Sequence, residues 1–224
     1  MIKVENIDVY GFEHAVRAMR NPMSSWEKSD SKWGFEMPEN NDLSPVTYYI
    51  GDNDLDLMKR LYKAGTEHRT YARMIYVWMD ITAPLYLWKE IDRYSVGKSQ
   101  VSTSTMHKIH AKEFTDDDFS MEHLIEDNDH AAVFISSMHR TIADLNTARE
   151  LYLKTKDKKW WWQLIQLLPS SYNQKRTVCM SYEVVFKIIR ERTGHKLDEW
   201  NDFVKILRDL PYVKEIMETE NAAE

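Results

Sequence analysis

The segment TYARMIYVWMDIT, residues 70–82, constrains the fold of this chain more than any other. It is rich in aromatic and β-branched residues, which is typical of a strand buried on both faces. Directly after it, Thr82 is placed to N-cap a helix with Pro84 in its first turn. A shorter strand is expected at Ile2–Val9. The chain is therefore expected to contain a sheet with helices connected directly to its strands.

Helical spacing dominates most of the remaining sequence. Phe12, Ala15, Val16 and Met19 recur on one helical face, and the acidic-start segment 52–65 predicts an amphipathic helix that ends at Gly65. Proline, Ser, Asp and Asn between 21 and 45 predict a long loop, and 96–110 predicts a loop leading into a strand. Further helices are expected at 131–154, 160–168, 178–192 and 197–209. We therefore predict a single α+β domain over residues 1–224, with a largely helical second half.

Composition excludes several classes of protein. With 43% hydrophobic and 12% aromatic residues, the 224-residue chain is not disordered. Its apolar runs are too short to span a bilayer, and acidic residues stand where a signal peptide needs basic ones. A single cysteine, Cys179, is expected in a reducing cytoplasm. The net charge of −6 argues against a broad nucleic-acid surface, but basic segments at 154–159 and 186–196 leave room for a local anion site.

Standard motifs for phosphate loops, dinucleotides and metals are missing from the sequence. His107 and His110 are three residues apart without a third ligand, so no metal site is predicted and solvated or core-edge histidines are preferred. Cys179 lies in an apolar run, which favours a buried, inert thiol. The three tryptophans at 160–162 cannot all face one core; one is expected to pack against another subunit or a flat ligand, unless the core is large.

Four clusters combine Arg with hydroxyl and aromatic side chains. Hydroxyls and backbone amides bind phosphate or ribose, and Arg adds charge-assisted hydrogen bonds. Any one cluster alone is better explained as a polar turn, but four together favour a nucleotide-like ligand. The clusters are RAMRNPMSSWEKSDS, GTEHRTYAR, DRYSVGKSQVSTSTMH and SSYNQKRT, the last followed by Arg190 and Arg192.

The same clusters fall within longer stretches whose order is informative. These are AVRAMRNPMSSW, LMKRLYKAGTEH, APLYLWKEIDRYSVGKSQVSTSTMH and LLPSSYNQKRTVCMSYEVVFKIIRERTGHKLDEW. In this order they resemble a divergent branch of the flavin-dependent thymidylate synthases, loosely from Gly11 to Trp200. In that family a helix beginning near Ala-Pro runs into the motif RHRxxSxNExSxR, and a later Leu-Pro opens a segment that ends in a nucleotide-binding Arg. The resemblance implies a central, mostly antiparallel sheet packed with helices.

The motif is only partly kept in this chain. Arg93 falls on the first Arg, whereas Tyr94 and Ser95 replace the His and the second Arg. Gln100 falls on the Asn, and Val101 replaces the Glu. These departures place the usual handling of the flavin in question more than the fold.

The resemblance also implies which residues contact ligands. Arg192 is implied as the catalytic residue that orients the uracil, and it also binds substrate. The other implied substrate contacts, on the phosphate, are Ser102, Ser104 and Arg176. The implied cofactor-binding residues are His68, Arg69, Arg93, Tyr94 and Ser181.

The activity implied by the resemblance is the methylation of dUMP to dTMP. It requires FAD, NADPH and methylenetetrahydrofolate, needs no cysteine nucleophile, and takes place in homotetramers. Two alternatives remain open. The altered motif favours a pyrimidine-modifying flavoenzyme of other chemistry or a nucleotide-binding paralogue. The acidic segment 116–129 and the tryptophans would instead serve as docking surfaces in a purely structural or interaction protein.

Overall fold

A computed structural model of the chain describes residues 2–35, 46–124 and 132–218. The chain divides into two compact units, each assembled from segments far apart in sequence. Our expectation of one domain over 1–224 is not decided by this division and stays a prediction. Unit 1 comprises Met1–Glu5, Asp80–Tyr94 and Gln100–Val178, and unit 2 comprises Asn6–Met79, Ser95–Ser99 and Cys179–Glu224.

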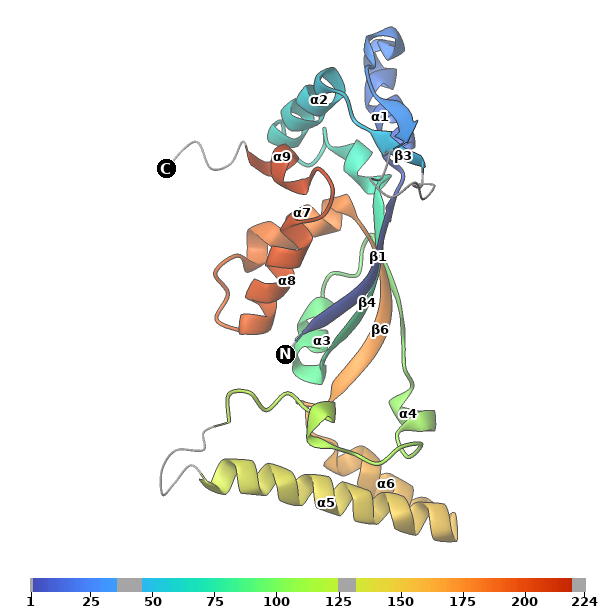
Figure 1. Cartoon of the computed structure of the whole chain (residues 1–224), viewed down its shortest axis with the longest axis vertical. Helices are drawn as coiled ribbons and strands as arrows, with labels where there is room; N and C mark the ends of the chain where they lie inside the picture. The colour runs from blue at the N-terminus through green and yellow to red at the C-terminus, as the bar shows by residue number, and fades with distance from the viewer. Residues whose placement is uncertain (1, 36–45, 125–131, 219–224) are drawn as a thin grey trace. The chain divides into compact units, whose positions relative to one another are not determined.

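A four-stranded sheet orders its strands β1-β4-β6-β5 (Figure 1). The Leu85 amide donates to the Tyr172 oxygen at one end of the β4–β6 pair, and the Tyr182 amide donates to the Ile75 oxygen at the other. Because the partner number falls as the residue number rises, these strands are antiparallel. The α+β class and the antiparallel sheet are thus confirmed. The strands are β1 (Lys3–Tyr10), β4 (Tyr76–Pro84), β5 (Lys98–Ser102) and β6 (Asn173–Ser181).

Strand β4 alternates between a buried and a partly exposed face. Val77, Met79, Ile81 and Ala83 are almost completely buried, whereas Tyr76, Asp80 and Thr82 are half-buried and Trp78 is 39% exposed; only the last residue, Pro84, departs from this alternation. The prediction that this strand is buried on both faces is therefore wrong. Large aromatic residues on the even positions hid the two-residue period, because Tyr and Trp count as apolar although they tolerate an exposed edge.

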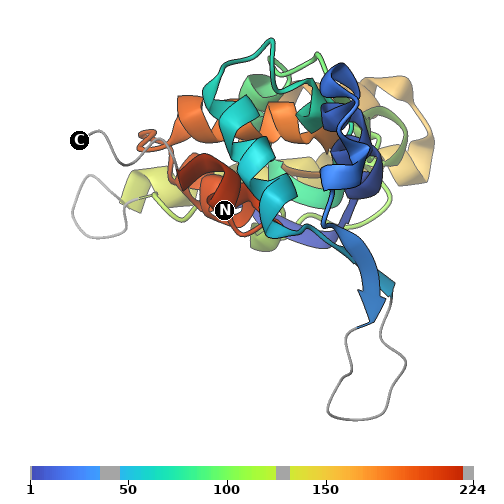
Figure 2. The ribbon, with the colours of Figure 1, turned by 90° about the horizontal axis from the view of Figure 1, so that it is seen from above.

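Unit 2 contains packed pairs of helices and carries a hairpin. Helix α2 contacts α9, and α7 contacts α8. Strand β2 pairs antiparallel with β3, and the hairpin extends away from α1 and α2 in Figure 2. The elements are α1 (Phe12–Arg20), η1 (Asn21–Met23), η2 (Trp26–Lys28), β2 (Lys32–Phe35), β3 (Val46–Tyr49), α2 (Asp52–Lys63), η3 (Thr70–Arg73), α7 (Tyr182–Arg192), α8 (Asp198–Arg208) and α9 (Val213–Met217).

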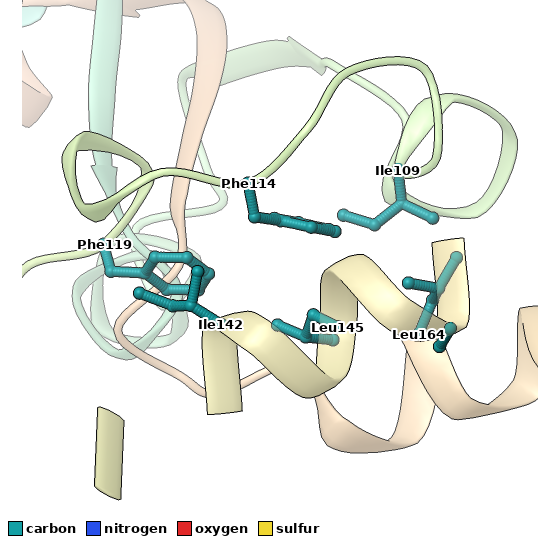
Figure 3. Close-up of a cluster of buried hydrophobic side chains, with 7 residues drawn as sticks. Ile109, Phe114, Phe119, Ile142, Leu145 and Leu164 are labelled. Carbon is teal, nitrogen blue, oxygen red and sulfur yellow. The ribbon is translucent and has the colours of Figure 1, made fainter. Parts of the chain in front are cut away.

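Unit 1 has a hydrophobic core of its own, shown in Figure 3. Side chains from the segment after α4 meet those of α5 and α6, and the two helices pack against each other. The core consists of Ile109, Phe114, Phe119, Ile142, Leu145, Ala148 and Leu164. The helices are α3 (Leu85–Ile91), α4 (Thr105–Lys108), η4 (Asp116–Asp118), α5 (Ala132–Thr155) and α6 (Lys158–Leu167).

Most helices occur where the sequence predicts them, with three corrections. Thr82 belongs to β4, and Pro84 is the residue that precedes α3. Residues 178–181 continue β6, so the helix expected at 178–192 begins only at Tyr182. Strand β2 occupies part of the region expected to be a loop; residues 36–45 of that region lie outside the described residues. Among the described residues, no helix combines the length and apolarity that crossing a membrane would require.

A buried ion pair fastens α1 to α2 in unit 2. Arg20 Nε lies 2.6 Å from Asp54 Oδ1, and both side chains are almost completely buried. The hydroxyls of Ser29 and Ser31 donate to Asp54 Oδ2 at 2.7 and 2.6 Å. Burial alone would raise the pKa of Asp54, but the hydrogen bonds from Ser31, Ser29 and Arg20 outweigh this effect and lower it.

We expect Asp54→Asn to lower the free energy of unfolding by about 3 kcal/mol, because Arg20 is left buried without its counter-ion. The pKa of Asp54 is lower in the folded chain, so its contribution is complete above pH ~4 and is lost as the pH falls through the folded-state pKa. Urea denaturation between pH 2 and 7 measures both effects, and the variant should lose less stability in acid than the parent.

The control is Asp56→Asn on the same helix. Asp56 makes an exposed pair with Arg60 at 2.8 Å. Its loss should cost no more than ~0.5 kcal/mol. Equal costs for the two variants would contradict the structural role of the buried pair.

Candidate functional site

Arg176 of β6 lies on the face of a buried tryptophan in unit 1. Its guanidinium carbon is 4.2 Å from the centre of the Trp88 ring, and only 12% of the Arg176 side chain is exposed. Trp88 is fully buried, and its indole N–H donates to the Gln174 backbone oxygen at 2.9 Å, which fixes the ring. Arg176 Nε donates to Gln174 Oε1 at 3.0 Å. The guanidinium is therefore held in one orientation before any ligand arrives.

Asp92, next to the end of α3, neutralises this guanidinium. Arg176 Nη1 donates to both Asp92 carboxylate oxygens, at 2.9 and 3.2 Å. Gln100 Nε2 donates to the same carboxylate at 2.6 Å. The Asp92 side chain is 43% exposed, so a phosphate that approaches Arg176 competes with a carboxylate that is itself accessible. Sequence reasoning missed Asp92, which is adjacent to Arg93 but carries no motif signal.

The other predicted contacts of unit 1 differ in accessibility. Arg93 and Ser102 are exposed, and neither side chain has a partner among the described residues. Ser104 caps α4, its hydroxyl oxygen accepting the His107 amide at 3.0 Å. Tyr94 is 5% exposed and belongs to the core. Arg93 and Ser102 are therefore available to a ligand, whereas Tyr94 has mainly a packing role.

Unit 2 repeats the arrangement of arginine on tryptophan. Arg192, the last residue of α7, lies with its guanidinium carbon 4.7 Å from the centre of the Trp200 ring, and Trp200 is fully buried. Both arginines that the sequence assigns to substrate thus rest on buried indoles. Spacing did not reveal this support, because Trp88 is far from Arg176 in sequence and Trp200, although close to Arg192 in sequence, belongs to the next helix, α8.

The turn after α2 holds the predicted contacts His68 and Arg69. His68 is exposed, and its ring has no partner among the described residues. Arg69 is buried instead: its Nε lies 2.9 Å from Glu183 Oε2, and its Nη2 donates to Thr66 Oγ1 at 2.8 Å. Its guanidinium also lies 5.0 Å from the centre of the Tyr62 ring. A ligand that contacted Arg69 would have to compete with this ion pair.

Ser181, where β6 passes into α7, is 2% exposed. Its amide donates to the Gly97 oxygen at 2.9 Å. Gly97 has a φ of +79°, and a β-carbon there would come within 3.0 Å of the Ser181 hydroxyl. Glycine is favoured at this point because side-chain-bearing residues rarely adopt this backbone conformation and a β-carbon would make a tight contact.

A cavity of about 710 Å³ in unit 2 was not predicted from sequence. Tyr10 and Trp78 contact edge to face with ring centres 5.8 Å apart, and Trp33 meets Tyr48 at 5.2 Å. These four aromatic residues line the cavity, and the volume of the cavity lies in the range of small-molecule sites. The even-numbered aromatic residues of β4, which include Trp78, were the signal that could have revealed it.

The structure agrees with the prediction that the Cys179 thiol is unreactive. The side chain is half-buried, and burial raises the pKa of its thiol, which disfavours the nucleophilic thiolate. Within residues 2–35, 46–124 and 132–218, no group of three His, Cys, Asp or Glu side chains is placed to hold a metal ion.

Comparison with known proteins identifies the fold. No protein-family profile matches the sequence, and no curated protein matches it. Among solved structures, thymidylate synthase X (ThyX) from Helicobacter pylori, with FAD and dUMP, is similar with a TM-score of 0.69 at 17% identity, over 97% of this chain and 98% of that one. A second, flavin-dependent ThyX structure of that organism, complexed with FAD and dUMP, gives 0.65 at 17%, over 96% and 99%.

A UMP/dUMP methylase, PolB from Streptomyces cacaoi bound with 5-Br UMP, is also similar. Its TM-score is 0.64 at 13% identity, over 98% of this chain and 94% of that one. The chain therefore has the fold of these proteins along nearly its whole length.

We expect Arg176→Ala to lower the free energy of unfolding by about 1–3 kcal/mol, because it removes the contact with Trp88 and leaves Asp92 without its counter-ion. Chemical denaturation measures the change. Arg93→Ala is the matched control: this exposed arginine has no partner among the described residues, so its loss should stay within ~0.5 kcal/mol. If Arg176→Ala left the free energy of unfolding unchanged, the result would contradict the structural role of the Arg176 contacts with Trp88 and Asp92.

Proposed function

We propose that this chain is a flavin-dependent enzyme that methylates dUMP to dTMP, with methylenetetrahydrofolate as the one-carbon donor and NADPH as the reductant. The observation that carries the proposal is the fold shared, over 97% of the chain, with a thymidylate synthase that was crystallised with FAD and dUMP. The ordered sequence segments support the same family independently of the fold.

Bound FAD, once reduced, supplies hydride chemistry that no protein side chain provides. The chain's own part is to bind, to orient and to polarise. In this proposal Arg192 orients the uracil and donates hydrogen bonds that stabilise charge developing on the ring. No thiol nucleophile is needed, which agrees with the raised pKa of Cys179.

The substrate phosphate is assigned to Arg176, with Ser102 and Ser104. Arg176 is oriented by Trp88 and Gln174, and its exchange of Asp92 for a phosphate keeps the guanidinium paired throughout. Ser102 is exposed and presents its hydroxyl without a protein partner among the described residues. Charge-assisted bonds of this kind are the usual means of holding a phosphate.

The side chains present are compatible with a flavin. The side chains of His68 and Arg93 are exposed and have no partners in the described part of the chain, so both are available to an anionic or aromatic cofactor. We assign these two to the flavin. Arg69, Tyr94 and Ser181 are buried, and we assign them a supporting part in holding the cofactor-binding segments.

A second function is favoured by a specific observation. Tyr94, Ser95 and Val101 replace three residues of the flavin motif. One of the similar structures is named as a methylase of UMP as well as dUMP. The alternative is therefore a pyrimidine-nucleotide-modifying flavoenzyme of different substrate or chemistry, or a non-catalytic nucleotide-binding paralogue.

We further propose a homotetramer in the cytoplasm, with small molecules rather than nucleic acid or a membrane as partners. These assignments follow from the sequence resemblance, the single cysteine and the net charge of −6. Size-exclusion chromatography coupled to light scattering measures the subunit number directly.

We expect the purified protein to be yellow, with a flavin absorption band that bleaches when NADPH is added. It should also rescue a thymidine-requiring strain. A colourless protein that takes up no added FAD would reject both flavoenzyme proposals and favour a structural role. A flavin-loaded, well-expressed protein that fails to rescue would favour the alternative.

We expect Arg192→Ala to weaken dUMP binding at least about tenfold, because charge-assisted hydrogen bonds are lost. Isothermal titration measures the affinity, and flavin content should not change. Arg208→Ala is the control, since this arginine lies at the end of α8 and its side chain donates, within the described part of the chain, only to Thr193. Unchanged dUMP affinity in Arg192→Ala, or an equal loss in Arg208→Ala, would refute the assignment.

A further inference from the structure

A group of positive charges surrounds a histidine in unit 1. Lys108 ends α4, Arg149 lies on α5, and Lys156 follows the last residue of α5. Arg149 Nε donates to the His110 backbone oxygen at 3.1 Å. The His110 ring meets Tyr152 edge to face, with 4.9 Å between ring centres. Lys108, His110, Arg149 and Lys156 are named the His110 cluster below.

The cations of this cluster are not neutralised by the described part of the chain. None of Lys108, Arg149 and Lys156 forms an ion pair with a described carboxylate. Two acidic residues of unit 1 pair with other lysines: Asp157 lies 3.1 Å from Lys159 Nζ, and Asp118 pairs with Lys112. In a chain of net charge −6, three basic side chains close to one histidine and without ion pairs to described carboxylates form a local positive region suited to an anion.

His110 itself has an unsatisfied group. Its Nδ1 is buried and has no hydrogen-bond partner among the described residues. Burial lowers the pKa of His110, and Lys156, Lys108 and Arg149 lower it further. Burial and the neighbouring positive charges therefore both disfavour the protonated imidazole. An anion bound among the cations would reverse this effect and raise the pKa.

We propose that the His110 cluster binds the phosphate group of a small ligand. A phosphate carries up to two negative charges and several acceptor oxygens, which match two ammonium groups and the terminal nitrogens of Arg149. Lys108 and Lys156 are exposed and Arg149 is half-buried, so all three side chains are accessible to solvent. None of the four cluster residues is among those assigned to dUMP, although Lys108 ends the helix that Ser104 caps, and the proposal does not depend on the proposed function.

The test is a titration of the full-length protein with inorganic phosphate, at constant ionic strength, followed by NMR of the His110 ring. We expect saturable binding, an upward shift of the His110 pKa, and an affinity loss of about tenfold in Arg149→Gln. Lys154→Gln is the matched control, because this exposed lysine lies on the same helix outside the cluster. The phosphate affinity of the Lys154→Gln variant should change less than about twofold.

A parallel titration with dUMP, read at His110, identifies the source of the phosphate. If dUMP binds more tightly than inorganic phosphate, the result supports a nucleotide ligand. If the two bind equally, it supports recognition of the phosphate group alone. The proposal is overturned if chloride shifts His110 as much as phosphate does, or if Lys154→Gln and Arg149→Gln lose affinity equally. It is also overturned if only a single-stranded oligonucleotide binds. None of these outcomes depends on flavin content or dUMP methylation.

Discussion

The antiparallel pairing of β4 with β6 is the constraint on which the rest of the structure depends. Each of these strands runs directly into a helix, β4 into α3 and β6 into α7. Arg93 follows α3, and Arg192 ends α7. The register of the β4–β6 pair therefore determines where the helices that carry these two predicted ligand contacts begin. The pairing also decides which residues of β4 reach the core, because a shift by one position would exchange its two faces.

The arginine-on-tryptophan contacts connect stability with function. A guanidinium that rests on a buried indole loses little further conformational freedom when it binds an anion. The entropy cost of orienting it is met on folding rather than on binding. Asp92 then keeps Arg176 neutralised before a ligand binds. The side chains of Arg93 and His68, in contrast, have no partners among the described residues, so a ligand that bound there would have to order them itself. The chain thus combines preorganised contacts with free ones.

Sequence reasoning predicted the α+β class and most helices, because the 3.6-residue spacing of apolar residues survives without tertiary information. It failed where tertiary context decides: residues 178–181 read equally well as helix or strand until β4 is available as a partner. The site is only partly readable for the same reason. Arg176 and Arg192 are visible in the sequence, but Trp88, Trp200 and Asp92 become neighbours only after folding.

The two buried indoles have a consequence for how the protein can be observed. Trp88 lies in unit 1 and Trp200 in unit 2, and each has a guanidinium positioned over its ring. Indoles shielded from water fluoresce at shorter wavelengths than exposed ones such as Trp33 and Trp162. Displacement of either arginine changes the electric field at a single chromophore. In each unit, the fluorescence of a buried tryptophan therefore reports on the position of the arginine that lies over its ring.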